Sequence, residues 1–426
     1  MTAGRKGACD WLLQASGPIV RWRTASELCR GFHEPELTRL RRELVDHPLV
    51  QTWLGRLSAG RSGVNLDRID PRTLQQLGGK VHGSTCTALE NVLGKLAEFG
   101  MQAGMAVLDE QMLPLMRVFT ARAEWQGDTT FQSAWESLVK SVFAWGLLRT
   151  GYRPDPPMRD YLYRHLESTH KIARDRVYDL YADRVELAGL PKAWAGKAIL
   201  KQEVMAGYHL PLIHDMYMLA HWPADMLDSE SAGLIDDIVA YILDPRFQAL
   251  PVGYGYAWIN ERRACYSWGW SPHLPGFYGF DFHHPSEVGE LVQRLELMAH
   301  FPAARRSRWF LSALQHLDQF RTGHGTSRFP SRYLHELPDG YYVSGALMGL
   351  GENRRGKAGL EIESTFRMIR ILGLMGVGQD PSSQVAENPR PAINPRATGL
   401  RRTGDEGQRA RQMRQFSMPR SESQVL

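Results

Sequence analysis

The chain has 426 residues, of which 43% are hydrophobic, and this is enough to bury a sizeable core. Its net charge of +5 is a mild excess for this length, and much of it comes from arginines near the C-terminus, which argues against a nucleic-acid partner. No window approaches about 18 uninterrupted apolar residues, so we expect no membrane span and a cytoplasmic protein.

Apolar residues at helical spacing predict helices along the first part of the chain. The first runs over 18–29 and stops at Gly31, and the second covers 48–57. Two more fill 87–116 and break near Gly100, with Ser84 or Thr85 as the N-cap of the first. The four cysteines, which lack metal-ligand spacing, are predicted to be buried thiols in a reducing compartment: Cys9, Cys29, Cys86 and Cys265.

The same spacing predicts helices through the rest of the chain. We expect one over 131–151, two within 159–185, one with Pro211 at its first position, and one over 231–243 that ends before Pro245. Two helices follow over 286–301 and 302–320. The segment 251–285 is rich in Gly, Pro and aromatic residues, and it predicts an irregular loop or short hairpin. We therefore expect an all-α domain over 1–375 and a disordered basic tail over 376–426.

A weak internal repeat suggests how these helices are organised. The segments LLRTGYRPDPP, ending at Pro157, and QFRTGHGTSRFP, ending at Pro330, share their opening residues and each follow an amphipathic helix. The second, extended to SALQHLDQFRTGHGTSRFPSRYL, resembles the repeat of squalene and oxidosqualene cyclases. Arg321 stands where that family has Gln, and Phe329 lies near its Trp position.

Three further segments resemble a poorly characterised bacterial group in the superfamily of terpenoid cyclases and protein prenyltransferases. They are WLLQASGPIVRWRTASEL, HGSTCTALENVLGKLAEFGM, and the stretch from LELMAHFPAARRSRWF through GYYVSGALMGLGENRRGKAGLEIESTFRMIRIL. The resemblance spans about Asp10 to Leu374. It implies an α/α toroid, with inner and outer helices around a central cavity, and it implies no established reaction.

The signature acids of that superfamily are missing. No Asp-x-Asp-Asp run is present, and Asp236 and Asp237 lack the third Asp of Asp-Asp-x-x-Asp because Ala240 stands there. Cys265 lacks the Asp that would complete a zinc-binding Asp-x-Cys pair. We therefore expect no metal site and no cofactor, except Mg²⁺ if the substrate is a diphosphate.

Aromatic residues of the loop are the first candidates for substrate binding. Their rings could stabilise a carbocation, stack on sugar rings, or simply pack in the core. They alternate along the chain as Tyr254, Tyr256 and Trp258, then Tyr266, Trp268 and Trp270.

Polar residues near these rings are the candidates for catalysis. Asp281 and His283 would lie on one side of an extended segment, where the carboxyl group could act as an acid, although a capping Asp beside surface histidines fits equally. The repeat turn and the polar cluster after it add candidates whose alternative role is to tie helix ends together: His324 and Glu352 for catalysis, and Tyr333, Tyr342 and Arg354 for binding.

Two further groups of histidines have structural alternatives. His82 precedes a predicted helix N-terminus, near Glu90, where an anion could bind, or the turn could simply cap the helix. His214 and His221 share a helix with Asp215 but lie two turns apart, about 10 Å, which is too far to share one ion. We interpret them as core or rim histidines.

Three hypotheses follow. The leading one is a cyclase without the usual signature acids, which protonates an isoprenoid or similar hydrophobic substrate through Asp281. The second is a carbohydrate-active toroid, a lyase or hydrolase, that relies on His324, Tyr333, Tyr342 and Glu352. The third is a non-catalytic lipid- or peptide-binding protein. A closed, dry cavity would favour the first hypothesis, and an open, wet groove would favour the second.

Overall fold

The computed structural model describes residues 3–29, 31–62, 64, 76–123, 130–183, 190, 192–194, 196–259, 264–282, 285–356 and 358–376. Most of this part of the chain is helical, as predicted. Its α-helices are α1 (Ala3–Ala15), α2 (Pro18–Arg23), α3 (Glu34–Val45), α4 (Pro48–Gly60), α6 (Leu89–Glu98), α7 (Ala106–Ala123), α8 (Thr130–Arg149), α9 (Pro156–Asp175), α10 (Gln202–Gly207), α11 (Ile213–Ala220), α12 (Ser229–Ile242), α13 (Pro245–Gln248), α14 (Pro285–Met298), α15 (Pro302–Arg305), α16 (Arg308–Asp318) and α17 (Gly359–Leu374).

Short turns and one hairpin connect these helices. The hairpin pairs β1 (Tyr256–Ile259) antiparallel with β2 (Ala264–Ser267), and Tyr256 lies opposite Ser267. The alternative of a short hairpin for the aromatic loop is therefore confirmed. The 3₁₀ and π turns are η1 (Thr24–Leu28), η3 (Lys192–Trp194), η4 (Ala224–Met226), η5 (Val252–Tyr254), η7 (Ser331–Tyr333) and η8 (Tyr342–Ser344).

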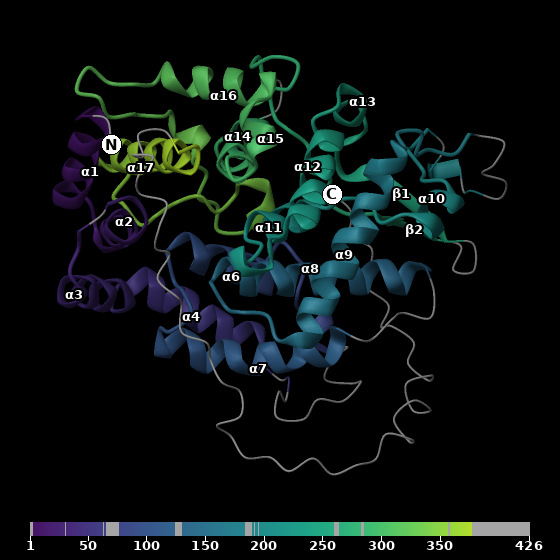
Figure 1. The fold of residues 1–426 in the computed structure, drawn as a ribbon, viewed down its shortest axis with the longest axis horizontal. Helices are drawn as coiled ribbons and strands as arrows, with labels where there is room; N and C mark the ends of the chain where they lie inside the picture. The colour runs from purple at the N-terminus through teal and green to yellow at the C-terminus, as the bar shows by residue number, and fades with distance from the viewer. Residues whose placement is uncertain are drawn as a thin grey trace, which may run out of the picture.

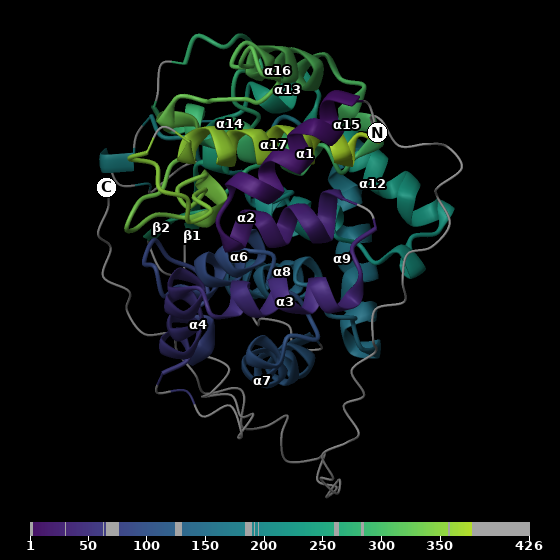
Figure 2. The same cartoon turned by 90° about the vertical axis from the view of Figure 1, so that its left-hand side faces the viewer.

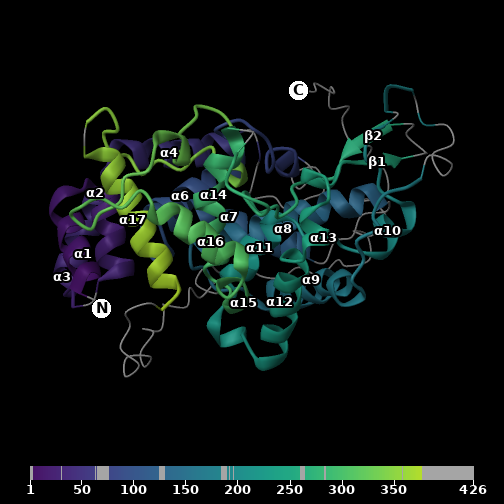
Figure 3. The ribbon, with the colours of Figure 1, turned by 90° about the horizontal axis from the view of Figure 1, so that it is seen from above.

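The helices pack on one another in chain order. α6 lies between α4 and α8, α8 contacts α7 and α11, α11 contacts α14, and α14 contacts α17, which returns to α1 and α2. α16 and α7 lie at opposite edges of the molecule, with α14, α6 and α8 between them (Figures 1 and 2). The N-terminal helices α1–α3 and the β1–β2 hairpin lie at opposite ends (Figure 3).

Periodicity located most helices correctly because one stripe of each enters the core. The apolar positions predicted for α4 are buried at Val50, Trp53, Leu54 and Leu57. The break near Gly100 is confirmed, since α6 ends at Glu98 and α7 begins at Ala106. None of the described helices combines the length and apolar character that a membrane crossing needs.

Three local predictions are wrong. The N-cap of α6 is Ala88, so neither Ser84 nor Thr85 caps the helix. The described part of the predicted segment, 159–183, holds one helix rather than two, and this helix ends where Arg176 takes a left-handed conformation. Pro211 lies before α11, whose N-cap is Leu212.

Two other predictions have mixed or untested outcomes. Among the cysteines, only Cys9 is fully buried; Cys29, Cys86 and Cys265 are half-buried. The predicted tail lies outside the described residues, apart from Gly376.

Gly94 tests the packing at the centre of the fold. A Cβ atom at Gly94 would lie 2.4 Å from Cγ of Tyr342. We expect Gly94→Ala to lower the free energy of unfolding by about 1–3 kcal/mol, because the methyl group must displace a buried ring. The matched control is Gly55→Ala in α4, where a Cβ meets no neighbour within 4 Å, so the protein should be unchanged or more stable by up to about 1 kcal/mol. Urea unfolding followed by circular dichroism compares the two, and an unchanged Gly94→Ala protein would contradict the contact.

Candidate functional site

A cavity of about 420 Å³ lies beside the aromatic loop. Its walls are mainly ring side chains, which come from four separate parts of the chain. Val252, which is 64% exposed, and the exposed Ser267 lie at its rim, so the cavity opens to solvent. The wall residues are His82, Trp135, Leu138, Trp268, Trp270 and Tyr341.

The six rings predicted to bind substrate divide between the cavity and the core. Trp268 and Trp270 line the cavity, and Trp270 lies 4.9 Å from the ring of Tyr341. Tyr254 is fully buried and donates a hydrogen bond to the carbonyl of Pro211, and Trp258 is 5% exposed. Both rings therefore lie outside the cavity wall, where the core covers them.

The other two rings, Tyr256 and Tyr266, are half-buried in the hairpin strands and do not belong to the cavity wall. Tyr256 instead packs edge-on against Trp194, with ring centroids 4.9 Å apart. Packing, the alternative left open for these rings, thus describes Tyr254, Tyr256 and Trp258, whereas Trp268 and Trp270 line the cavity. Trp135 and Tyr341, which no local pattern marked, complete the wall in their place.

Behind the wall, two histidines flank a fully buried carboxylate. Glu90 Oε1 lies 2.8 Å from Nδ1 of His82, and Oε2 lies 2.9 Å from Nε2 of His214. The side chains of Glu90 and His214 are completely buried, and that of His82 is 19% exposed. The ring of His82 also stacks on Tyr341, with centroids 5.1 Å apart. This trio therefore lies directly against the cavity wall.

The turn that carries His82 is fixed from α6. The backbone N–H of Gly83 donates to Glu90 Oε1 at 3.0 Å. The Asn91 amide donates to the carbonyls of Gly83 and Thr85, both at 2.8 Å, and its Oδ1 accepts from the N–H of Tyr342 at 2.7 Å. Two consecutive polar residues of α6 thus hold the turn and place His82 beside Glu90.

The charge of Glu90 is unusual for a buried carboxylate. Burial raises the pKa of Glu90, but the adjacent His82 and His214 outweigh burial and lower the pKa to about 2. Within the described part of the chain, these histidines are its ion-pair partners, and neither Arg nor Lys pairs with it. The carboxylate is therefore ionised, and a histidine proton or a bound cation must balance it.

A second trio has the same composition on the neighbouring helices. Asp215 Oδ1 lies 2.9 Å from Nε2 of His165, and Oδ2 lies 2.8 Å from Nε2 of His209. The N–H of Leu212 also donates to Oδ2, which makes Asp215 a cap of α11. In both trios the three possible ligand atoms lie within 4.8 Å of one another. The sequence prediction of no metal site is thus open to question.

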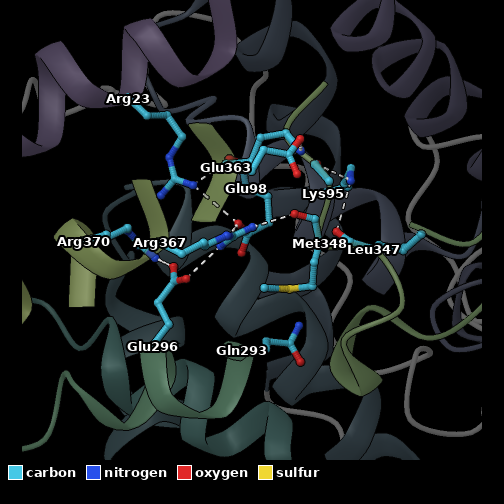
Figure 4. A network of polar contacts seen from close by, with 12 residues as sticks. Arg23, Lys95, Glu98, Gln293, Glu296, Leu347, Met348, Glu363, Arg367 and Arg370 are labelled. Carbon is cyan, nitrogen blue, oxygen red and sulfur yellow. Dashed lines mark hydrogen bonds and ion pairs between the residues drawn. The ribbon is translucent and has the colours of Figure 1, made fainter. Parts of the chain in front are cut away.

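A buried network of charges lies at the C-terminal ends of α6 and α8, away from the Glu90 trio (Figure 4). Glu98, the last residue of α6, pairs with Arg23 at 3.4 Å, Arg367 at 2.6 Å, and Arg149, the last residue of α8. Tyr342 donates its hydroxyl to the same carboxylate at 2.5 Å. Burial raises the pKa of Glu98, but the three arginines hold it well below its ordinary range.

Tyr342 is therefore part of the buried charge network, and it lies outside the wall of the aromatic cavity. Glu352, Arg354 and Tyr333 also lie outside the cavity wall. Arg354 pairs with Glu363 and donates to the carbonyl of Leu334, and the buried Tyr333 lies 2.8 Å from a ring nitrogen of His316. The alternative interpretation of these residues, as ties between helix ends, is confirmed by their contacts.

Among the described residues, the predicted catalytic groups of the loop and repeat turn lie outside the cavity wall. Asp281 and His324 are exposed, and neither belongs to the wall. His283 lies outside the described residues. Glu352 accepts a hydrogen bond from the backbone N–H of Gly17 at 2.7 Å, which joins α17's preceding loop to the start of α2. His82 is the one predicted site residue outside the loop that the structure brings to the cavity.

Comparison of the chain with protein-family models, with curated proteins and with solved structures finds no match. The site is therefore interpreted from its own geometry.

The raised pKa of Glu352 predicts that the stability of the protein depends on pH. Burial raises the pKa of Glu352 from 4.5 to about 6, so the folded state resists its ionisation. As pH rises from about 4.5 through 6, the unfolded chain loses this proton first and the native protein loses stability relative to it. Glu352→Gln keeps the acceptor for Gly17 and cannot ionise. The experiment measures the thermal stability of the variant and of the native protein at pH 4.5 and at pH 8. We expect the variant's stability relative to the native protein to be greater at pH 8 than at pH 4.5. An equal difference between the two proteins at both pH values would contradict the raised pKa.

Proposed function

We propose that the protein is an enzyme that acts on an acidic carbohydrate in the open aromatic cavity of an α/α toroid. The observation that carries the proposal is the cavity itself: an opening to solvent, walls of three tryptophans and a tyrosine, and a histidine backed by an ionised buried glutamate. Stacked aromatic rings are suited to the faces of sugar rings, and an open groove admits a chain of them.

The direction of the helices supports the toroid. Residues at the beginnings of α6, α8 and α11 lie at the cavity or against its wall, namely Glu90, Trp135 and His214. Residues at their C-terminal ends, Glu98, Arg149 and His221, all border the small void beside the charge network. These three neighbouring helices therefore run in the same direction. In a toroid the inner helices are parallel to one another and the outer helices return between them.

The same direction favours an anionic substrate. Helix N-termini carry a partial positive charge, and three of them begin on the cavity side. A sugar carboxylate would be attracted there. Among the described residues, the wall of the cavity holds no carboxylate, whereas glycoside hydrolysis normally requires two. The residues present fit β-elimination better, in which a base removes the proton next to the sugar carboxylate and an acid protonates the departing oxygen.

His82 and Tyr341 are the two groups of the wall that can transfer protons in such a reaction. Their rings are stacked, so both face the same part of the cavity. Burial, with the charge of Glu90, raises the pKa of Tyr341, which keeps its hydroxyl protonated in the resting protein. Glu90 lies 2.8 Å from Nδ1 of His82 and accepts from the N–H of Gly83, so it holds the turn that carries the imidazole and favours a positive charge on it.

An isoprenoid cyclase is the second candidate, because the ring-rich wall would also accommodate a hydrocarbon and its cation. Its proton donor is the difficulty. Asp281 is exposed and outside the wall, and Glu90, with its pKa near 2, is already ionised. The solvent opening at Val252 and Ser267 also satisfies the criterion for the carbohydrate hypothesis.

Trp270 tests the binding surface. We expect oligosaccharides of uronic acids to quench tryptophan fluorescence, and Trp270→Ala to weaken their binding about tenfold through loss of the stacking face. The matched control is Trp11→Ala, since Trp11 is half-buried in α1 and outside the cavity wall. Equal binding by all three proteins would contradict the assignment of the cavity.

Turnover is tested with the same oligosaccharides. The unsaturated product of β-elimination absorbs in the ultraviolet, and His82→Ala should reduce its formation about 100-fold or more. Parallel incubation with farnesyl diphosphate, geranylgeranyl diphosphate and squalene, with and without Mg²⁺, followed by gas chromatography and mass spectrometry, tests the cyclase. A cyclic terpenoid product would favour the cyclase over the carbohydrate enzyme, and binding without any product would leave a binding protein.

A further inference from the structure

Two trios of histidine, carboxylate and histidine are close enough to hold an ion, but they differ in how their polar atoms are satisfied. In the Asp215 trio each imidazole makes an aligned hydrogen bond to the carboxylate. The remaining ring nitrogens lie 3.3 Å from hydroxyl groups, of Tyr161 for His165 and of Ser137 for His209. Every polar group of this trio therefore has a hydrogen-bond partner without an ion. Its contacts are those of a structural cluster that caps α11 and connects it to α9.

The Glu90 trio is different at His82. Nδ1 of His82 is buried and only 2.8 Å from Glu90 Oε1, yet it makes no hydrogen bond among the described residues. The two atoms are thus close while the ring nitrogen is not directed along the line to the oxygen. Ligand atoms that converge on a common ion have this arrangement, because each lone pair is directed at the ion rather than at the other ligand.

The charge of the Glu90 trio also calls for a cation. Glu90 is fully buried, and its described ion-pair partners are histidines, which are neutral in the form that binds metals. By contrast, Glu98 at the other end of α6 is balanced by three arginines. A divalent ion held by two imidazoles and one carboxylate would balance Glu90 and occupy the nitrogen of His82 that lacks a partner.

We propose that His82, Glu90 and His214 bind one divalent transition-metal ion of the Zn²⁺ class, with its remaining coordination positions directed to the aromatic cavity. Two histidines and one carboxylate leave such an ion open to a further ligand. Since His82 is both a ligand and a wall residue, that further ligand is an oxygen atom of whatever occupies the cavity. A carboxylate of an acidic sugar is the natural donor.

The role of the ion in catalysis rests on the proposed function, whereas the binding of the ion does not. Bound to the sugar carboxylate, the ion would withdraw electrons and make the neighbouring proton more acidic. With Nδ1 of His82 on the ion, hydroxide from solvent at the open face of the ion would accept the proton next to the carboxylate, and the hydroxyl of Tyr341 would protonate the departing oxygen. Metal binding itself needs no substrate and can be measured independently.

The test is a titration of the full-length protein, freed of metal by a chelator, with ZnCl₂ in an isothermal calorimeter. We expect one equivalent to bind at micromolar concentration or tighter, and His82→Ala, at the partly exposed ligand, to weaken it at least tenfold. The matched control is His209→Ala, which removes a partly exposed member of the other trio and should leave the affinity unchanged. Co²⁺ should replace Zn²⁺ and give a visible absorption band that His82→Ala removes. Circular dichroism of each variant confirms that it is folded.

Three results would overturn the proposal, and a fourth would separate it from the proposed function. Absence of binding would mean that the trio is a hydrogen-bonded group, and His82 would remain the base of the proposed enzyme. Binding that is lost in His209→Ala but kept in His82→Ala would place the ion in the Asp215 trio. Binding that survives both changes would place it elsewhere. Failure to degrade carbohydrate, with one equivalent of metal bound and lost in His82→Ala, would contradict the proposed function and leave the metal site in place.

Discussion

The buried carboxylate of Glu98 is the interaction on which the centre of the structure depends. It is the last residue of α6, and it receives Arg23 from α2, Arg149 from α8 and Arg367 from α17. Arg367 then reaches Glu296 of α14 at 2.8 Å, so five helices meet through one connected network. Breaking one partner of such a buried group commonly costs about 3–5 kcal/mol, because the remaining charge is left unbalanced in the interior.

This network explains why the other end of the helices can be open. α6, α8 and α11 meet at their C-terminal ends, where Glu98 is paired with three arginines and the remaining void, about 10 Å³, has room for about one water molecule. At their N-terminal ends the chain is held instead by a turn, a hairpin and the segment of Tyr341 around a large cavity. The helices are thus fixed at one end, and the loops at the other end shape the site.

The sequence revealed the helices because their apolar stripes have a clear period, but it could not reveal this network. All ten residues of α6 are buried, including Glu90, Asn91, Lys95 and Glu98. A helix buried on every side has no polar face, so periodicity cannot separate its structural charges from its functional ones. Lys95, for example, is completely buried and donates to Glu336 and to two backbone carbonyls.

The candidate site was found from the sequence only in part, and the reason is distance along the chain. Local patterns marked Trp268, Trp270 and His82, which line the cavity, but Glu90 and His214 are 124 residues apart and no spacing rule joins them. Alternation along the loop also marked six rings as candidates, of which Trp268 and Trp270 line the cavity. Alternation suggested that Tyr254 and Trp258 share a face with the ligand, whereas that face is the one that packs into the core.

The two buried glutamates of α6 differ in the partners that balance their charges. Both are fully buried and ionised at opposite ends of one helix. Glu98 has arginines and a tyrosine hydroxyl as partners, so it satisfies the requirements of a stable interior. Among the described residues, the ion-pair partners of Glu90 are two histidines, and Nδ1 of His82 beside it has no hydrogen-bond partner. Proteins retain such local imbalances mainly at functional sites, because elsewhere an apolar residue would be more stable. The contrast within one helix is therefore stronger evidence for the site than the cavity volume alone.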